Sequence, residues 1–445
     1  MYLPPLLLES LQHAKGYDPD AFVFVHEQPA SITSVRINPA KPIALPFSSL
    51  KVPWSDTGFY LEQRPSFTFD PLFHAGAYYV QEASSMFLEQ ALKQTMDLSK
   101  DIRVLDLCAA PGGKSTHLQS LISAKSLLVS NEVIRSRVNI LEDNLVKWGG
   151  DNVMVTNNDP RDLSRLPRFF DVIVIDAPCS GSGLFRREPE AIREWSEHNV
   201  ALCSQRQQRI VSDIWTSLKP GGVLIYSTCS YSVQEDEDNH DWILNTLDAD
   251  PQPLKLAADW GITDTGKGYR FWPDKLKGEG FYLAVFRKKN EESVKMPRVK
   301  RKPVVMAEKD LPVLNKWMKT AGYTFIQHEN TVYAWPADLV YDMSLVLQEL
   351  RTTYSGVMAG ELIHGKLVPA HSLAMSKIIS PGVEKIELDR EMAIRYLQRK
   401  DLVIETGQTG WKLASFEGHS LGWMNVLKNR INNYYPGPLR IRKEL

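Results

Sequence analysis

Two cysteines of this chain each follow a run of apolar residues that has the pattern of a buried parallel strand. Residues 176–179 read Asp-Ala-Pro-Cys and residues 227–230 read Ser-Thr-Cys-Ser, so the two cysteines are fifty positions apart. In an open α/β sheet the carboxyl ends of the strands border the ligand crevice, so Cys179 and Cys229 could converge on one substrate. Two thiols in this arrangement suggest covalent chemistry.

A turn rich in small residues lies upstream of both cysteines. Residues 106–114 read Asp-Leu-Cys-Ala-Ala-Pro-Gly-Gly-Lys, between a strand pattern and a helix-like segment that begins at Ser115. Small residues let the backbone approach a ligand, and the amides of a helix start favour an anionic group such as a carboxylate. A nucleotide-triphosphate loop needs Gly where this chain has Cys108, and the dinucleotide pattern G-x-G-x-x-G is absent. The remaining interpretation is a pocket for S-adenosylmethionine.

Candidate partners for the rest of that cofactor follow the next two strand patterns. Glu132 could accept hydrogen bonds from ribose hydroxyls, and Asp159 could accept one from the adenine amino group. Taken singly, such acids are more often helix caps or solvated loop residues, but their positions at successive strand ends favour the binding role. Asp106 either shapes the turn or holds the methionyl ammonium, and both roles stay open.

The two thiols fit one reaction in particular, methylation of a pyrimidine at carbon 5. A thiolate that adds to carbon 6 makes carbon 5 nucleophilic, and removal of the carbon 5 proton after methyl transfer expels the sulfur. The attacking thiol needs a cation that lowers its pKa, for which Lys114 is the local candidate, and Asp176 could stabilise the base at its N3 and amino edge. The second cysteine would assist elimination. The alternative is that the cysteines are small core residues, which we expect for Cys203.

The elements that position these residues form an alternating pattern over residues 100–232. Short apolar runs at 103–108, 126–131, 152–156, 171–176 and 222–227 alternate with amphipathic stretches, which is typical of βαβ units around a parallel sheet. A hydrophobic run at 281–286 is expected to close the sheet. Residues 287–302 carry eight Lys or Arg. This composition predicts a solvated basic linker, with direct contact to an RNA backbone as the alternative.

Composition restricts the remaining possibilities. The chain has 445 residues and a formal net charge of -1, so a nucleic-acid partner would have to be held by local basic patches. Its four cysteines include no CxxC pair and no zinc-type spacing, which argues against a disulfide scaffold or a structural metal. No apolar run approaches the ~20 residues of a membrane span, and no signal peptide is recognisable. We expect a cytoplasmic protein without a metal or membrane contact, and nothing demands more than a monomer.

The cysteine strings and the small-residue turn together resemble the motifs of the Sun/Fmu-type RNA 5-methylcytosine methyltransferases. The resemblance extends to residues 36–39 (Arg-Ile-Asn-Pro), 81–85, 270–273 and 278–281, with Asp274 where relatives usually have His. It implies that Cys229 is the nucleophile and that Cys179 promotes release. It also implies a cofactor site, whose members are Cys108, Ala109, Ala110, Pro111, Gly112, Gly113, Lys114, Glu132, Asp159 and Asp176.

Two further regions resemble the bacterial small-subunit rRNA methyltransferase F group, which ends in a PUA-like RNA-binding module. They are residues 185–195 and a carboxyl-terminal region that includes 364–371, 421–424 and 428–436. Positions 428–443 contain five Lys or Arg and no acid, interleaved with Tyr434 and Tyr435. Such a patch can hold phosphates while the aromatic rings stack on unpaired bases. The alternative is a surface strand with packed tyrosines.

The resemblance implies an α/β fold with three parts. They are a Rossmann-like class I S-adenosylmethionine methyltransferase sheet, a small N-terminal α+β RNA-recognition domain and a C-terminal PUA-like α+β module. The expected boundaries place the N-terminal domain at 1–70, the methyltransferase domain at 71–290 and the basic linker at 291–303. An intermediate subdomain at 304–360 and the PUA-like domain at 361–445 complete the chain.

The predicted function is formation of 5-methylcytosine in 16S rRNA of the small ribosomal subunit, through a covalent adduct between a cysteine and carbon 6. The predicted catalytic residues are Cys229, Cys179, Asp176 and Lys114. The target cytosine must leave its stack to meet Cys229. Two alternatives remain, a tRNA cytosine-5 methyltransferase and a non-catalytic RNA-binding ribosome assembly factor.

Overall fold

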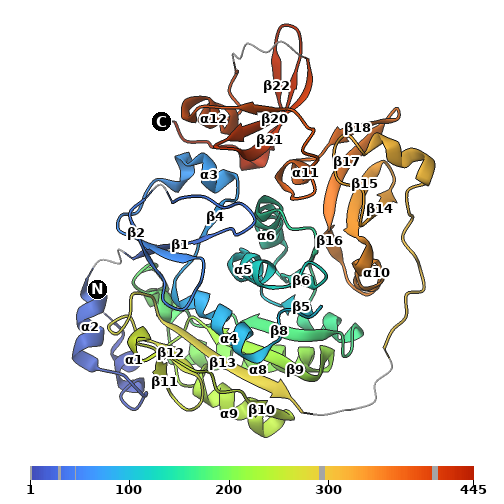
Figure 1. Cartoon of the computed structure of the whole chain (residues 1–445). Coiled ribbons are helices and arrows are strands. Elements are labelled where there is room, and N and C mark those ends of the chain that lie inside the picture. The colour runs from blue at the N-terminus through green and yellow to red at the C-terminus, as the bar shows by residue number, and fades with distance from the viewer. Residues whose placement is uncertain (1–2, 29–31, 46, 290–295, 403–408, 445) are drawn as a thin grey trace.

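The largest sheet has the strand order β11-β12-β13-β9-β8-β5-β6-β7-β16, with β10 paired to β13 (Figure 1). The computed structural model describes residues 3–28, 32–45, 47–289, 296–402 and 409–444. Five neighbouring strands are parallel, namely β5 (Arg103–Asp106), β6 (Leu127–Asn131), β7 (Val153–Thr156), β8 (Phe170–Asp176) and β9 (Leu218–Thr228). The chain order reverses between β5 and β8. Ligands bind at the carboxyl ends of strands beside such a reversal.

All five strands expected from the sequence are present, and the largest difference in bounds concerns the last one. The stretch 219–222, expected as a turn before the strand, lies inside β9. The pairing of β8 with β9 shifts register here, and Gly221 adopts a left-handed φ of 72°. The glycine therefore lets the extra residues form a bulge, and the strand continues through it.

The hydrophobic run at 281–286 does form a strand, β13 (Phe281–Lys288), but it does not close the sheet as expected. Two short strands, β12 (Tyr269–Phe271) and β11 (Thr263–Asp264), continue beyond it in antiparallel pairing. At the opposite edge β16 (Thr352–Ser355) pairs with β7. Strands this short carry too little alternation to be recognised from sequence.

Helices cover both faces of this sheet. Strand residues alternate between two hydrophobic clusters, so that Val104 and Val172 face one side and Leu105 and Ile173 face the other. The first side packs against α4 (Leu88–Thr95), α5 (Gly113–Leu121) and α6 (Arg135–Trp148), and the second against α8 (Glu197–Ile214), α9 (Glu237–Thr246) and α10 (Val340–Glu349). Two further elements of the same part of the chain are α7 (Ala191–Glu194) and β10 (Ala249–Pro251).

A separate antiparallel sheet lies near the N-terminus. Its order is β2 (Ser49–Lys51), β3 (Gly58–Leu61), β1 (Thr33–Ile37) and β4 (Tyr78–Val80), and it follows α1 (Pro5–Ser10) and α2 (Pro19–Glu27). The segment between β3 and β4 contains α3 (Pro71–His74). The last strand of this sheet lies beyond the boundary expected at residue 70. Its pairing with β1 holds it to the N-terminal sheet.

Two small sheets follow the basic linker. One contains β14 (Tyr323–His328), β15 (Thr331–Pro336), β17 (Val357–Ile363) and β18 (Lys366–Pro369), and the other contains β19 (Lys385–Glu387), β20 (Gly410–Phe416), β21 (His419–Val426) and β22 (Ile431–Asn433). Helix α11 (His371–Met375) lies between them in the chain, and α12 (Arg390–Leu397) belongs to the second unit. The boundary expected at residue 360 falls inside β17, because that strand pairs on both sides within one sheet.

The N-terminal sheet and the last sheet of the chain share one hydrophobic core, although they lie far apart in the sequence. Val35, Leu72 and Tyr78 belong to the same buried cluster as Tyr396 and Met424. Figure 1 shows this arrangement, with the N-terminal sheet in blue next to the final unit in red. Among the described residues no helix is both long and apolar enough to cross a membrane.

A buried arginine joins the N-terminal sheet to the small-residue turn. Arg36 on β1 donates to Gln81 Oε1 at 2.9 Å and to Thr116 Oγ1 at 2.6 Å, and its guanidinium lies 4.5 Å from the centre of the Trp148 ring. It also donates to the carbonyl oxygen of Gly113 at 3.3 Å. Because Gly113 and Thr116 form the first turn of α5, the N-terminal sheet holds the helix that follows the turn.

Candidate active site

The carboxyl ends of β8 and β9 bring the two predicted catalytic thiols into contact. These strands are adjacent and parallel, with Asp176 opposite Ser227. The sulfur atoms of Cys179 and Cys229 are 2.8 Å apart, and both cysteines are free thiols. One thiol can therefore donate a hydrogen bond to the other.

Backbone hydrogen bonds join the two cysteine loops to each other and to a third loop. The Ala177 amide donates to the carbonyl oxygen of Ser227 at 2.8 Å, and the Gly183 amide donates to the carbonyl oxygen of Cys229 at 2.9 Å. The Gly280 amide in turn donates to the carbonyl oxygen of Gly183 at 3.1 Å. Gly183 has no room for a side chain, because an added Cβ would lie 2.4 Å from the Gly280 oxygen. The loops thus pack as one unit.

The two thiols differ in their surroundings. The hydrogen bond with Cys229, burial and the charge of Glu235 together raise the pKa of Cys179 well above its usual value. Cys179 therefore carries its proton at neutral pH. Cys229 lies on the wall of an open cleft, whereas Cys179 is not among the residues that line it within the described parts of the chain.

That cleft has a volume of about 340 Å³ and joins the small-residue turn to the nucleophile candidate. Several predicted site residues line it, namely Cys108, Ala109, Ala110, Pro111, Gly113, Lys114, Asp176 and Cys229. Other lining residues were given no role from sequence, and they include Tyr79, Glu82, Arg187, Glu188, Glu279 and Phe281. The motifs at 81–85 and 278–281 were a signal that could have indicated two of these segments.

Lys114 and Asp176 form an ion pair on the cleft wall. The Lys114 Nζ atom lies 2.7 Å from Asp176 Oδ2, and the Ser227 hydroxyl donates to Asp176 Oδ1 at 3.0 Å. The lysine also lies 5.2 Å from the centre of the Phe281 ring. Its closest charged partner is thus the carboxylate of Asp176.

Side chains of α6 hold the small-residue turn in place. Arg137 donates to the carbonyl oxygen of Ala110 at 2.6 Å, and Asn144 donates to that of Pro111 at 2.8 Å. Gly112 adopts a left-handed φ of 113° just before α5 begins, a conformation that favours glycine. This conformation leads the turn directly into the first residues of the helix.

The three acids around the turn have different environments. Asp106 is fully buried and accepts from the Ser115 hydroxyl at 2.6 Å, while its Oδ1 atom has no hydrogen-bond partner among the described residues. Burial raises the pKa of Asp106 to about 7. Glu132 is buried and accepts from the Ile134 amide at 2.8 Å. Asp159 accepts from the Arg161 amide at 3.2 Å and so caps a short helix, which is the alternative to a binding role.

The other two cysteines do not join the thiol pair. Burial and the nearby carboxylates raise the pKa of Cys108, so this residue of the turn remains a neutral thiol. Cys203 is 4% exposed on α8, as expected for a core residue. Within the described parts of the chain, no group of three or more His, Cys, Asp or Glu side chains could hold a metal ion.

Three family models match separate parts of the chain. The model described as 16S rRNA methyltransferase RsmB/F matches residues 93–287. The N-terminal domain of 16S rRNA methyltransferase RsmF matches residues 3–83, and the methyltransferase RsmF PUA domain matches residues 383–441. In chain order the matches cover the N-terminal sheet, most of the largest sheet and the last sheet, and none of them covers the sheet of β14, β15, β17 and β18.

Similar proteins cover nearly the whole chain. The ribosomal RNA small subunit methyltransferase F of Vibrio parahaemolyticus is 30% identical over 482 aligned positions, which cover 100% of this chain and 99% of the relative. The protein with the same description from Aeromonas salmonicida is also 30% identical and covers 91% of this chain and 90% of its own length.

Solved structures resemble about two thirds of the chain. A methyltransferase homologue from Pyrococcus horikoshii is 28% identical, with a TM-score of 0.52, over 64% of this chain and 100% of its own. NSun6 from the same organism, solved with SFG, has a TM-score of 0.55 at 20% identity over 65% of this chain and 99% of its own, a likeness of fold.

The contact between the two sulfur atoms predicts that a trivalent arsenical bridges them. Phenylarsine oxide should bind the native chain with one equivalent per thiol pair, since soft thiolates bind such atoms when two are close together. Gly183→Ala should weaken this binding by about tenfold, or ~1.4 kcal/mol, because its methyl group would push the Cys229 loop away. Titration against a competing monothiol measures the affinity.

Gly181→Ala provides the matched control in the same loop. An added Cβ at Gly181 meets no atom within 4 Å, although its φ of 75° makes any side chain unfavourable. Native affinity in Gly183→Ala, or an equal loss in both variants, would contradict the packing described above.

Proposed function

This chain belongs to the ribosomal RNA small subunit methyltransferase F family, and we propose that it methylates carbon 5 of a cytosine in 16S ribosomal RNA with S-adenosylmethionine as the methyl donor. The observation that carries the proposal is the contact of 2.8 Å between the sulfur atoms of Cys179 and Cys229 beside the cleft. A pair of thiols at the ends of two parallel strands suits a reaction that must form and then break a bond to the base.

The cleft has features that fit the cofactor. Small residues of the turn line it, and the buried Oδ1 atom of Asp106 has no hydrogen-bond partner among the described residues. We propose that residues 108–114, Glu132, Asp159 and Asp176 hold S-adenosylmethionine, with Asp106 Oδ1 available to its ammonium group. When bound, the cofactor supplies the methyl group.

Cys229 is the proposed nucleophile because it lies on the cleft wall. Its thiolate forms a bond to carbon 6 of the cytosine, and the electron pair of the double bond between carbons 5 and 6 moves to carbon 5. After carbon 5 has been methylated, loss of its proton to water returns an electron pair to that double bond. The bond between sulfur and carbon 6 breaks in the same step, its electron pair goes to sulfur, and Cys229 leaves as a thiolate.

Cys179 is proposed to assist that last step. Its raised pKa keeps it protonated, and its sulfur atom lies 2.8 Å from that of Cys229. The thiol can therefore donate a hydrogen bond to the departing sulfur. Cys179 therefore has a different role from Cys229, because only an unprotonated sulfur can attack the base.

Asp176 is proposed to recognise the cytosine. Its carboxylate faces the cleft, where it can accept a hydrogen bond from the amino group of the base. The ion pair with Lys114 and the hydrogen bond from Ser227 fix its orientation. Lys114 supports this carboxylate and offers positive charge to the base as electron density develops.

A basic surface near the C-terminus supports an RNA partner. Tyr434 is 43% exposed and its ring centre lies 4.4 Å from that of Trp411, whereas Tyr435 is only 3% exposed and packs against Tyr396. We propose that Tyr434 stacks on a base while exposed cations from residues 428–443 contact phosphates. These cations are Lys428, Arg430, Arg440, Arg442 and Lys443. Tyr435 is thus packed inside the protein, in agreement with the alternative of a strand with packed tyrosines.

Purified protein incubated with labelled cofactor should methylate 16S RNA, either free or in 30S particles, and should leave tRNA unlabelled. Mapping the product should place the methyl group on carbon 5 of a cytosine. Labelling of tRNA alone would show that the ribosomal assignment is wrong. No labelling of any RNA would favour the assembly factor.

Substitution of each thiol separates their roles. Cys229→Ser should abolish methylation and leave no covalent complex with RNA, whereas Cys179→Ser should accumulate protein linked to RNA on a denaturing gel. Cys203→Ser is the control and should keep native activity, since that residue lies on the buried face of α8. The reverse pattern for the two thiols would make Cys179 the nucleophile.

A further inference from the structure

We infer that Glu235 is the positioning residue that holds both thiol loops in their reactive arrangement. Its side chain is completely buried and accepts four hydrogen bonds. The donors to Oε1 are the Ser180 amide at 2.9 Å and the Gln207 side chain at 3.0 Å. The donors to Oε2 are the hydroxyls of Ser180 at 2.5 Å and Ser230 at 2.6 Å.

These contacts reach both thiols through the residue that follows each one. Ser180 is next to Cys179 and Ser230 is next to Cys229, so one carboxylate connects the two loops. Gln207 extends the connection, since its amide group also donates to the carbonyl oxygen of Pro178 at 3.0 Å. The distance between the sulfur atoms therefore depends on a group that touches neither of them.

The next residue of the same segment strengthens this arrangement. The Thr228 hydroxyl donates to Asp236 Oδ1 at 2.6 Å, directly before Cys229 in the chain. Glu235 itself has no ion-pair partner among the described residues, so its charge is stabilised by the four donors. Loss of the carboxylate would leave those donors unpaired in a buried site.

Glu235 does not line the cleft, so it acts through the cysteine loops and makes no direct contact with substrate. Its negative charge also contributes to the raised pKa of Cys179. The carboxylate thus serves two purposes, because it sets the positions of both loops and favours the protonated form of the Cys179 thiol.

The kinetic test of Glu235 rests on the proposed function. A second measurement, the affinity for the arsenical, does not depend on that function. Ser230→Ala removes one hydrogen bond to Glu235 and should lower kcat by about 100-fold, with little change in the KM for RNA, because a small displacement of a reacting group is costly. Arsenical affinity should fall in parallel, which can be measured even if the chain methylates nothing.

Ser232→Ala is the matched control two residues away. Ser232 is also buried, and its hydroxyl has no hydrogen-bond partner among the described residues. It should keep native kcat and native arsenical affinity. Equal effects of the two substitutions, or native values in Ser230→Ala, would overturn the inference.

Two substitutions of Glu235 complete the experiment. In Glu235→Gln the amide oxygen can accept from the Ser180 amide and from Gln207, while its NH₂ group donates to the two serine hydroxyls. This variant should keep arsenical binding, whereas Glu235→Ala should lose it while still binding the cofactor. Loss of arsenical binding in Glu235→Gln with intact folding would show that shape alone does not position the loops.

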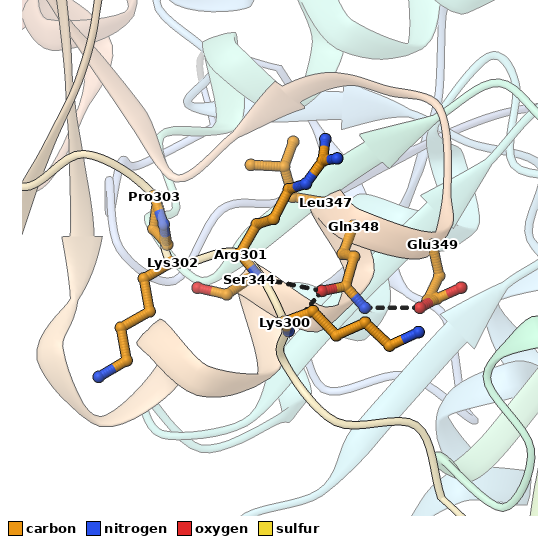
Figure 2. A pocket seen from close by; sticks show the side chains of 8 residues that line it. All are labelled: Lys300, Arg301, Lys302, Pro303, Ser344, Leu347, Gln348 and Glu349. Carbon is orange, nitrogen blue, oxygen red and sulfur yellow. Dashed lines mark hydrogen bonds between the residues drawn. The ribbon is translucent and has the colours of Figure 1, made fainter.

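A different surface leads to a second proposal, that the basic linker forms a binding notch for RNA phosphates. Lys300, Arg301, Lys302 and Pro303 border a hollow of about 520 Å³ together with residues of α10 (Figure 2). The three cations are exposed and form no ion pair among the described residues. The sequence alone favoured a plain solvated linker here.

One side chain of α10 fixes the linker backbone. Gln348 Oε1 accepts from the amides of Lys300 at 2.7 Å and Arg301 at 3.3 Å, and its NH₂ group donates to the carbonyl oxygen of Arg298 at 3.2 Å. Figure 2 shows Gln348 reaching the linker, the side chain of Lys300 running beside Gln348 toward Glu349, and the side chain of Lys302 extending away from both. The linker backbone is therefore held, and its charged groups remain available.

The notch lies at the sheet edge that leads to the proposed cofactor site. Three residues after Gln348, the Arg351 amide donates to Asn158 Oδ1 at 3.0 Å, next to Asp159 at the end of β7. A strand of RNA entering the cleft could extend along this edge. Exposed Lys and Arg groups with no other partner are suited to phosphate oxygens.

A salt titration of binding to protein-free 16S RNA tests the notch. Replacing Lys300, Arg301 and Lys302 together by Ser should reduce the slope of log K against log salt by roughly 2 to 3, since each phosphate contact contributes about 0.7 to 0.9. It should raise the KM for RNA and leave kcat unchanged. Replacing Lys309, Lys319 and Lys366, which are also exposed, should leave the slope as it is.

The outcome distinguishes this proposal from the proposed function, because binding is read without methylation. An unchanged slope of log K against log salt would contradict the proposal that the notch binds RNA phosphates. A loss confined to assembled 30S particles would also overturn it, since that result would indicate contact with a ribosomal protein.

Discussion

The arrangement of the site depends on one physical constraint. Two adjacent parallel strands end at the same edge of the sheet, and the loops that follow them both contact a single buried carboxylate. The hydrogen bonds of Glu235 to Ser180 and Ser230 hold the loops after β8 and β9 together. Gly183 permits the close approach of a third loop through Gly280. Without these contacts the two sulfur atoms would have no fixed separation.

This constraint explains how two thiols in contact can have different roles. Cys229 lines the cleft where the base is proposed to bind, while Cys179 is not among the described residues that line it and keeps its proton because hydrogen bonding and burial raise its pKa. In the proposed mechanism a thiolate and a neighbouring thiol form a complementary pair, in which one sulfur attacks and the other stabilises it as it leaves. The small-residue turn, held by α6 and by Arg36, lines the same cleft as Cys229.

The sequence predicted the parts of the fold with strong local patterns. Continuous apolar runs identify the five central strands, and the motif residues identify the turn and the cysteine loops. The pairing of β16 with β7 and the shared core of the first and last sheets could not be predicted, because they join segments that lie far apart in the chain. Glu235 was missed for a similar reason. A carboxylate in a polar stretch has no pattern that shows it to be buried until the loops around it are folded.

The central claim is that Cys229 forms the bond to the base and that Cys179 does not. RNA containing 5-fluorocytosine tests it most directly, because fluorine at carbon 5 prevents the elimination and leaves the sulfur attached to carbon 6. Mass spectrometry of peptides from the trapped complex should find the modified nucleotide on the peptide that contains Cys229. A modified peptide containing Cys179 would contradict the account.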